Sequence, residues 1–158
     1  MSVRTLNLLL PVLVCAGLYL GCDSSGNTIE VPPPRTVAEE DYSTTSSGLK
    51  YYDFSVGIGT RVDSSLAVSI QYILWLENGQ VINSSYFSGL PVTIILGRNE
   101  VVPGWEEGLL GMRVGGDRQV VIPPNLAYGA AGLPSAGIPP NATLIVEIAL
   151  LAVGVETG

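Results

Sequence analysis

Residues 101–109 read VVPGWEEGL and decide how the centre of this chain folds. Pro103 occupies a position that the first turn of a helix accepts. Trp105, Leu109 and Met112 recur at spacings of four and three residues, so they share one face of a helix. A helix of only about two turns is not stable by itself. The pattern therefore predicts a short helix that packs against a sheet.

The segments on either side of this helix have the residue pattern of β-strands. Residues 66–76 alternate between apolar side chains on one face and polar ones such as Ser69 and Gln71 on the other. Asn78-Gly79 predicts a hairpin directly after this strand, because both residues tolerate a positive φ. The other expected strands are residues 49–54, 81–84, 92–96, 117–122 and 144–153. One antiparallel sheet wrapped on one short helix makes an α+β domain, which we assign to residues 48–153.

The N-terminal residues have the features of an export signal. Arg4 precedes an almost wholly apolar run over residues 6–20, which is too short for a comfortable membrane span. Gly21 directly before Cys22 resembles the cleavage site of a bacterial lipoprotein, although Tyr19 replaces the usual aliphatic residue. Residues 1–21 are thus expected to be removed and Cys22 to be acylated as a lipid anchor. The alternative is an ordinary cleaved signal with an incidental cysteine.

Residues 22–47 differ from the domain in composition. They include the triple proline at residues 32–34, the acidic triplet at 39–41 and an unbroken Ser/Thr run at 43–47, with no hydrophobic period. Such a composition is typical of a solvated linker that polyproline conformation stiffens in part. We therefore expect a flexible tether over residues 22–47, and a short C-terminal tail over residues 154–158.

The overall composition excludes several classes of protein. The chain has 158 residues, of which 47% are hydrophobic, and its formal net charge is −7. The acidic balance argues against nucleic acid as a partner. The chain contains no histidine, which removes Ser-His-Asp and Cys-His nucleophile systems and histidine metal sites. We expect no metal and no cofactor, whereas apolar side chains for a pocket are abundant.

Five segments in order resemble the FKBP-type peptidyl-prolyl isomerases over about residues 48–153. They are residues 101–109 (VVPGWEEGL), 114–116 (VGG), 122–124 (IPP), 126–129 (LAYG) and 138–144 (IPPNATL). The resemblance implies an FKBP-like fold, in which a twisted antiparallel sheet of about five strands curls around the helix. It also implies a pocket between the two. Carried over residue by residue, the catalytic residues are Tyr72, Trp105, Tyr128 and Ile138, and the substrate-binding residues are Ile82, Asn83, Val92, Val101, Val102 and Val146.

The chain departs from the family at four of these positions. Family members commonly carry aromatic rings where this chain has Ile82, Val92 and Val146, and an aspartate where it has Asn83. The loss of aromatic rings implies a wider and softer cavity. We therefore expect macrolide inhibitors to bind weakly and isomerase activity to be reduced or shifted.

The resemblance implies an isomerase that rotates X-Pro bonds in proline-containing polypeptides, and the N-terminal signal implies that it is exported. Acting from a lipid anchor, it would face the periplasm or the outer surface of the cell, and it would be a monomer. The alternative is a proline-recognising binding or chaperone module that has lost most of its catalysis.

Overall fold

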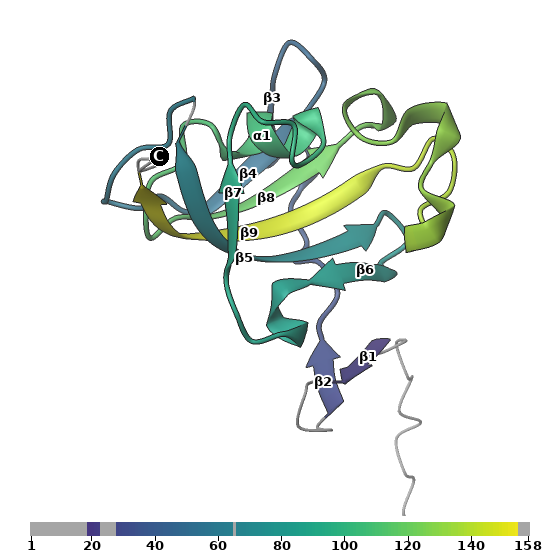
Figure 1. Ribbon diagram of the computed structural model, residues 1–158. Coiled ribbons are helices and arrows are strands. Elements are labelled where there is room, and N and C mark those ends of the chain that lie inside the picture. Colours follow the sequence, from purple (N-terminus) through teal and green to yellow (C-terminus); the bar gives the residue numbers. More distant parts are fainter. Residues whose placement is uncertain (1–18, 23–27, 65, 155–158) are drawn as a thin grey trace, which may run out of the picture.

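The computed structural model describes residues 19–22, 28–64 and 66–154 (Figure 1). Within these residues the main sheet has seven strands in the order β3-β4-β8-β9-β5-β6, and β7 also pairs with β5. The strands are β3 (Ser43–Thr44), β4 (Lys50–Ser55), β5 (Ala67–Leu76), β6 (Val81–Ser84), β7 (Val92–Ile95), β8 (Asp117–Ile122) and β9 (Leu144–Gly154). All of these pairs are antiparallel. Helix α1 (Pro103–Leu109) lies against one face of the curved sheet, as Figure 1 shows.

Five short 3₁₀ helices and a separate hairpin complete the described residues. The 3₁₀ helices are η1 (Glu39–Asp41), η2 (Ser85–Phe87), η3 (Pro124–Leu126), η4 (Gly129–Ala131) and η5 (Pro134–Ala136). The hairpin pairs β1 (Tyr19–Cys22) with β2 (Thr28–Val31) outside the main sheet. No helix among the described residues has the length and apolar character to cross a membrane. Most of the predicted signal peptide lies in residues 1–18, and most of the predicted tail in residues 155–158, outside the described residues.

The predicted α+β architecture is confirmed, with two corrections to the sheet. The sheet has seven strands where about five were expected. One of them, β3, is formed by Ser43–Thr44, which lie in the segment predicted as a tether. The pairing of β3 with Lys50 and Tyr51 of β4 is a backbone contact that the polar Ser/Thr composition did not indicate.

Strand β5 is central to the sheet because it has different neighbours along its two edges. Strand β9 pairs with the whole of one edge. On the other edge, β7 pairs with residues from Ala67 to Ile70, and β6 pairs with those from Ile73 to Trp75. Gln71 and Tyr72 therefore lie where one partner strand ends and the other begins.

Helix α1 approaches the sheet closely because two of its residues have no side chain. A Cβ at Gly104 would lie 2.3 Å from Cγ2 of Ile122, and a Cβ at Gly108 would lie 2.9 Å from Cγ1 of Val120. Both partners belong to β8. The close approach buries Trp105, the residue that follows Gly104, so that its side chain is 7% exposed. Trp105 and Leu109 share one face of α1 and belong to the core, as the helical spacing predicts. Met112 also belongs to the core, but it lies beyond the end of α1 at Leu109 and not on the helix as predicted.

The far end of α1 is held by a buried arginine. The guanidinium of Arg118 in β8 donates to the carbonyl oxygens of Gly108 (2.9 Å) and Leu110 (3.3 Å). It also forms two hydrogen bonds with the Asp53 carboxylate, at 2.7 and 2.9 Å. Carbonyl groups at a helix C-terminus lack partners within the helix, so a paired cation there stabilises the last turn.

Residues 31–44 pack along the sheet instead of forming the flexible tether that their composition predicted. We call residues 31–42 the strap. Val31 is buried, and the indole N–H of Trp75 donates to the Pro32 carbonyl at 3.2 Å. At the other end of the strap, the Tyr42 hydroxyl donates to the side chain of Gln119.

Arg35 joins the strap to the sheet through ion pairs. Its guanidinium lies 2.8 Å from the carboxylates of Glu147 and of Asp117, and above the Phe54 ring at 3.4 Å. Burial acts to lower the pKa of Arg35, but the hydrogen bonds to Asp117 and Glu147 and the charges of these carboxylates together raise it above its ordinary value. Glu147 is the only charged residue of β9, and a largely buried carboxylate on an apolar strand requires a partner. Arg35 supplies that partner and adds to the other contacts of the strap with the sheet.

Candidate active site

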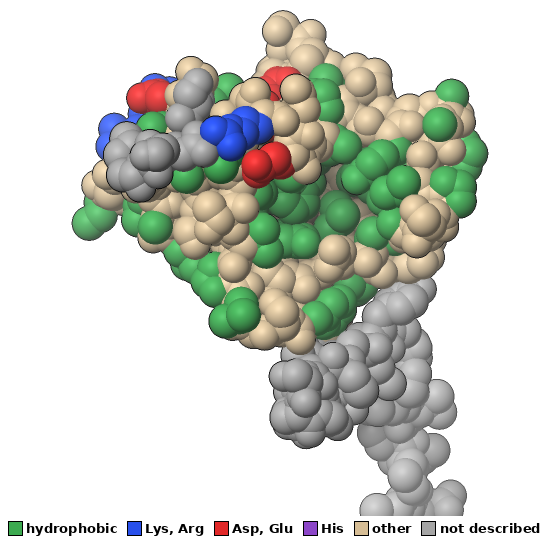
Figure 2. All heavy atoms as spheres, viewed as in Figure 1, with side chains coloured by type: hydrophobic (Ala, Val, Ile, Leu, Met, Phe, Trp, Pro, Cys, Tyr) green, Lys and Arg blue, Asp and Glu red, His purple; other side chains and the backbone are tan. Residues whose placement is uncertain are grey.

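A cavity of about 280 Å³ opens between α1, strands β5 to β7 and the loop after η3. Figure 2 shows it as a hollow whose floor is formed by hydrophobic side chains. The residues that line it are Tyr72, Leu74, Asn83, Val92, Thr93, Ile94, Glu100, Val101, Val102, Trp105, Tyr128 and Leu144. The cavity is large enough to take a proline ring and its neighbouring peptide groups.

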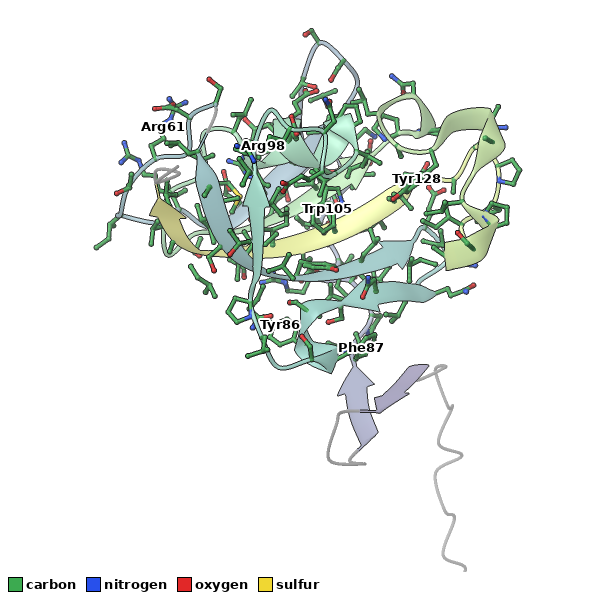
Figure 3. The ribbon with its side chains drawn as sticks, in the orientation of Figure 1. Arg61, Tyr86, Phe87, Arg98, Trp105 and Tyr128 are labelled. Atoms are coloured by element: carbon green, nitrogen blue, oxygen red, sulfur yellow. The ribbon has the colours of Figure 1, made fainter. Side chains whose placement is uncertain are left out.

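Two aromatic rings define the base of this cavity. The rings of Tyr72 and Trp105 meet edge to face, with centroids 4.8 Å apart and planes inclined at 76°. This is a favourable arrangement for aromatic quadrupoles. Trp105 projects from α1 toward the sheet, and Tyr128 lies nearby on the loop side (Figure 3). Burial, and secondarily the charge of an ionised Tyr128, raises the pKa of the Tyr72 hydroxyl, so Tyr72 stays neutral at physiological pH.

The backbone of Tyr72 is held by serine side chains where β6 and β7 leave it unpaired. Its N–H donates to the Ser85 hydroxyl at 2.9 Å, and its carbonyl accepts from the Ser84 hydroxyl at 3.2 Å. Both serines are almost completely buried. A buried backbone group without a partner is costly, so these serines replace the missing strand contact and fix Tyr72 beside Trp105.

The start of α1 contributes the wall that faces the sheet. Val102 is the N-cap residue, and its carbonyl accepts from the Trp105 N–H at 2.9 Å. Among the described residues the Val102 N–H makes no hydrogen bond, as is usual for the first amides of a helix. This N–H is therefore a donor available to a ligand carbonyl at the cavity wall.

Seven of the ten predicted site residues line the cavity. They are Tyr72, Asn83, Val92, Val101, Val102, Trp105 and Tyr128. Ile82, Ile138 and Val146 do not line it. Ile138 and Val146 are buried in the core, and Ile82 packs against that core. The aromatic side chain that the family carries at the position of Val146 is long enough to extend from the core into the pocket. Val146 is shorter and stays within the core.

Five lining residues were not predicted: Leu74, Thr93, Ile94, Glu100 and Leu144. Leu74 follows Tyr72 by two residues, so the alternation of β5 places both on the same face and could have identified it. Ile94 follows Val92 in the same way. Thr93 and Glu100 carry no such periodic signal, because their place at the cavity depends on how β7 and the loop after it are folded.

Asn83 makes a local hydrogen bond. Its side-chain oxygen accepts from the N–H of Ser84 at 2.7 Å. An exposed amide that is used in this way brings no charge to the cavity. The aspartate that stands here in the family would bring one, so the electrostatic surroundings of Tyr72 differ from the family pattern.

The lining has few groups that could perform acid or base chemistry. The titratable lining residues are Tyr72, Glu100 and Tyr128, and the Glu100 carboxylate accepts from the backbone N–H of Ile95 at 2.9 Å. No three His, Cys, Asp or Glu side chains of the described ranges gather as a metal site. The cavity can bind an apolar ring, accept or donate a few hydrogen bonds and exclude water.

Comparisons with known proteins agree on one family. The family model described as FKBP-type peptidyl-prolyl cis-trans isomerase matches residues 59–151. An FK506-binding protein of Neisseria meningitidis is 42% identical over 106 residues, which cover 67% of this chain and 96% of that protein. FK506-binding protein 4 of Chaetomium thermophilum is 45% identical over 106 residues, but this chain matches only 21% of its length.

The fold comparison gives the same result. The crystal structure of FkpA from Escherichia coli aligns with a TM-score of 0.67 at 40% sequence identity. The alignment covers 73% of this chain and 53% of that one. The curated relatives thus include proteins several times longer than the matched domain, and the shared part is the domain that holds the cavity.

Proposed function

Because the chain belongs to the FKBP-type peptidyl-prolyl cis-trans isomerase family, we propose that it catalyses rotation about X-Pro peptide bonds in exported polypeptides. The observation that carries the proposal is the cavity floored by Trp105 and walled by Tyr72 and Tyr128. An apolar, concave site with a few convergent polar groups is the usual form of a binding site.

The mechanism follows from the electronic structure of the amide. Rotation about an X-Pro bond is slow because the planar amide is stabilised by resonance, which gives a barrier of about 18–20 kcal/mol. Twisting the bond removes resonance and with it part of the charge separation. A cavity with apolar walls therefore stabilises the twisted amide relative to the planar one, which is preferential binding of the transition state.

Six of the lining residues have a role in this scheme. The proline ring rests on the indole of Trp105, whose orientation is set by Tyr72. The Tyr128 hydroxyl and the Val102 N–H donate to carbonyl groups of the substrate and fix its orientation. Val92 and Val101 shield the bond from water. The step makes and breaks no covalent bond, so it requires no nucleophile or base.

The test is the cis-to-trans rate of a short X-Pro peptide with and without the full chain. We expect acceleration proportional to protein concentration and inhibition by a macrolide of the FK506 type. A rate equal to the uncatalysed one, measured with correctly folded protein, would reject catalysis.

A second candidate is a proline-recognising module with little catalysis. The observation that favours it is Asn83, which supplies no carboxylate near Tyr72 and bonds to Ser84 instead. Peptide binding measured by calorimetry, together with an uncatalysed rate in the assay above, would identify this candidate.

We further propose that the protein acts from a lipid anchor at Cys22 in the cell envelope, facing the periplasm or the outer surface, as a monomer. The apolar run over residues 6–20 and Gly21 before Cys22 support export and acylation. The mass of the mature N-terminus tests this: an unmodified Cys22 would exclude the anchor. The molecular mass of detergent-solubilised protein tests the monomer.

A further inference from the structure

The strap begins only a few residues after the proposed lipid anchor. Cys22 and Val31 are nine positions apart in the sequence. An extended chain covers about 3.3–3.6 Å per residue, so the segment between them spans at most about 30 Å, however it is folded. A flexible segment that continued to residue 47, as the composition predicted, would span about 90 Å. The point at which the domain first holds the chain therefore decides how far the cavity can move from a bilayer.

Contacts with the domain hold the strap from its first residues. Val31 is 4% exposed, and the Pro32 carbonyl accepts from the indole N–H of Trp75 at 3.2 Å. Trp75 is itself buried, so this hydrogen bond is shielded from water. We call residues 22–30 the leash, because the chain is held by the domain from Val31 onward.

The attachment continues along the strap. The backbone N–H of Arg35 donates to the Glu147 carboxylate at 2.7 Å, and the Arg35 carbonyl accepts from the Gln119 side chain at 2.8 Å. Gln119 is buried, and it is also the partner of Tyr42 at the other end of the strap. The strap is thus held at both ends and in the middle, so none of it is available to lengthen the leash.

The strap lies on the face of the sheet opposite the cavity. Tyr72 and Leu74 line the cavity, and side chains alternate along β5, so Ile73 and Trp75 point to the other face. Ile73 borders a small groove together with Arg35 of the strap. Figure 1 shows the strap passing behind the sheet from β2 to β3. None of the strap residues, all of which the structure describes, lines the cavity, so the strap does not act as a lid.

We propose that the attached strap restricts the isomerase to X-Pro bonds close to the membrane, in polypeptide segments within about 65 Å of the bilayer surface. This limit combines the leash of about 30 Å with a domain that, for its size, is about 35 Å across. The substrate class is then the membrane-proximal part of exported or membrane-bound polypeptides. The inference rests on the proposed isomerase activity and on the proposed anchor at Cys22.

The test uses the mature chain from Cys22, which is its only cysteine because Cys15 lies in the signal. The protein is attached to phosphatidylcholine vesicles in two ways, through its native acyl groups and by coupling of the Cys22 thiol to a maleimide lipid. Each substrate carries one X-Pro site at the end of a transmembrane coiled coil whose helices continue unbroken from the bilayer. Spacers of about 20 and 50 residues hold the site about 30 and 75 Å from the surface. The vesicles are dilute, so that enzyme and substrate meet on the same bilayer.

Two variants lengthen the leash by different routes. The strap variant combines Val31→Ser with Arg35→Met and removes a buried side chain and the ion pairs of the strap. The linker variant keeps the strap and inserts about 40 Gly/Ser residues after Ser25, which gives a flexible extension. The matched control combines Val56→Ser with Arg61→Met, which change an exposed valine and an exposed arginine away from the strap.

We expect the wild type to isomerise the site on the long spacer roughly tenfold more slowly than the site on the short one, because a leash that cannot span the distance gives almost no effective concentration. The linker variant should reduce this difference to about threefold or less, and the strap variant should recover at least about threefold of the lost rate. The control should match the wild type. All four proteins should have similar kcat/KM on a soluble X-Pro tetrapeptide, because the strap does not line the cavity. Circular dichroism and thermal unfolding show whether each variant is folded, and the linker variant carries the test if the strap variant is not.

Four results would overturn the inference. Equal wild-type rates on the two spacers would mean that the leash is longer than residues 22–30. A linker variant that stays slow on the long spacer would mean that distance is not the limit. A folded strap variant that behaves as the wild type would show that the strap does not set the reach. An unmodified Cys22 in the natively produced protein would remove the anchor. Failure of the proposed function itself is distinguishable, because the wild type would then be inactive on the soluble tetrapeptide as well.

Discussion

The ring of Tyr72 meets the indole of Trp105 edge to face at 4.8 Å, although Tyr72 comes from a strand and Trp105 from a helix 33 positions later. Three local structural features bring Tyr72 and Trp105 together. Gly104 and Gly108 let α1 approach β8, Arg118 holds the end of the helix, and Ser85 holds the backbone of Tyr72. The geometry of the cavity thus depends on residues that do not line it.

Replacement of Trp105 tests this pair directly. Trp105→Leu removes the cavity floor and an aromatic pair worth about 0.5–1.5 kcal/mol beyond its buried area. We expect kcat/KM on a tetrapeptide to fall by roughly tenfold or more, since each 1.4 kcal/mol of lost transition-state stabilisation costs tenfold. Trp105→Phe keeps an aromatic ring and should retain intermediate activity. Equal activity of both variants and the wild type would contradict the assigned floor.

The Tyr128 hydroxyl is tested by Tyr128→Phe. A neutral hydrogen bond contributes about 0.5–1.5 kcal/mol, so kcat/KM should decrease by roughly two- to tenfold, with little change in the melting temperature. Ser85→Ala is the complementary variant, because it removes a buried partner of the Tyr72 backbone. It should lower stability by about 1–3 kcal/mol. A stability loss in Tyr128→Phe larger than that in Ser85→Ala would be inconsistent with these roles.

Substitutions at Val92 and Val146 should have different effects on macrolide binding and on stability. Val92 lines the cavity, whereas Val146 is fully buried. Val92→Phe should add an aromatic wall and strengthen macrolide binding by about 1 kcal/mol, or roughly fivefold. Val146→Phe should overpack the core and lower the free energy of unfolding by about 1–3 kcal/mol. Calorimetric titration checks the macrolide affinity, and urea unfolding checks the stability. If Val146→Phe strengthened macrolide binding and Val92→Phe lowered the stability, Val146 would be the residue that faces the ligand.

The regular elements were predictable because periodicity is a local property of the sequence. The expected strands at residues 81–84 and 117–122 have the observed bounds, and α1 begins at Pro103 as predicted. Seven lining residues followed from the family resemblance.

What could not be predicted depends on partners far away in the sequence. The strap has the composition of a linker, and the contacts that hold it come from distant strands, such as those of Arg35 with Glu147 and Asp117 and of Pro32 with Trp75. Ser84 and Ser85, which hold the backbone of Tyr72, likewise belong to no pattern in the sequence. They stabilise the site only because β6 and β7 leave the backbone of Tyr72 unpaired and the serines supply its partners.

The strap contact has its own test. Arg35→Met leaves the Glu147 carboxylate, whose side chain is 13% exposed, without its cation. We expect a loss of about 1–2 kcal/mol in the free energy of unfolding, with faster proteolysis within residues 31–44. The double variant Arg35→Met with Glu147→Met removes the unpaired charge and should recover part of the stability. Loss in the double variant equal to or greater than that in the single one would show that the ion pair is not what orders the strap.

The activity should not depend on pH between 6 and 9. The chain has no histidine, and burial followed by the influence of Tyr128 raises the pKa of Tyr72 above its ordinary value of 10.0. A raised phenol pKa means that the folded protein holds this proton more tightly than the unfolded chain does. The associated stability is therefore complete below pH 10 and is lost only as the pH rises through the folded-state pKa. The measurements are kcat/KM on a tetrapeptide from pH 6 to 9 and urea unfolding from pH 8 to 11. A bell-shaped rate profile with a midpoint near neutrality would require a titrating catalytic group, and it would contradict a mechanism in which the cavity acts by solvation of the twisted amide.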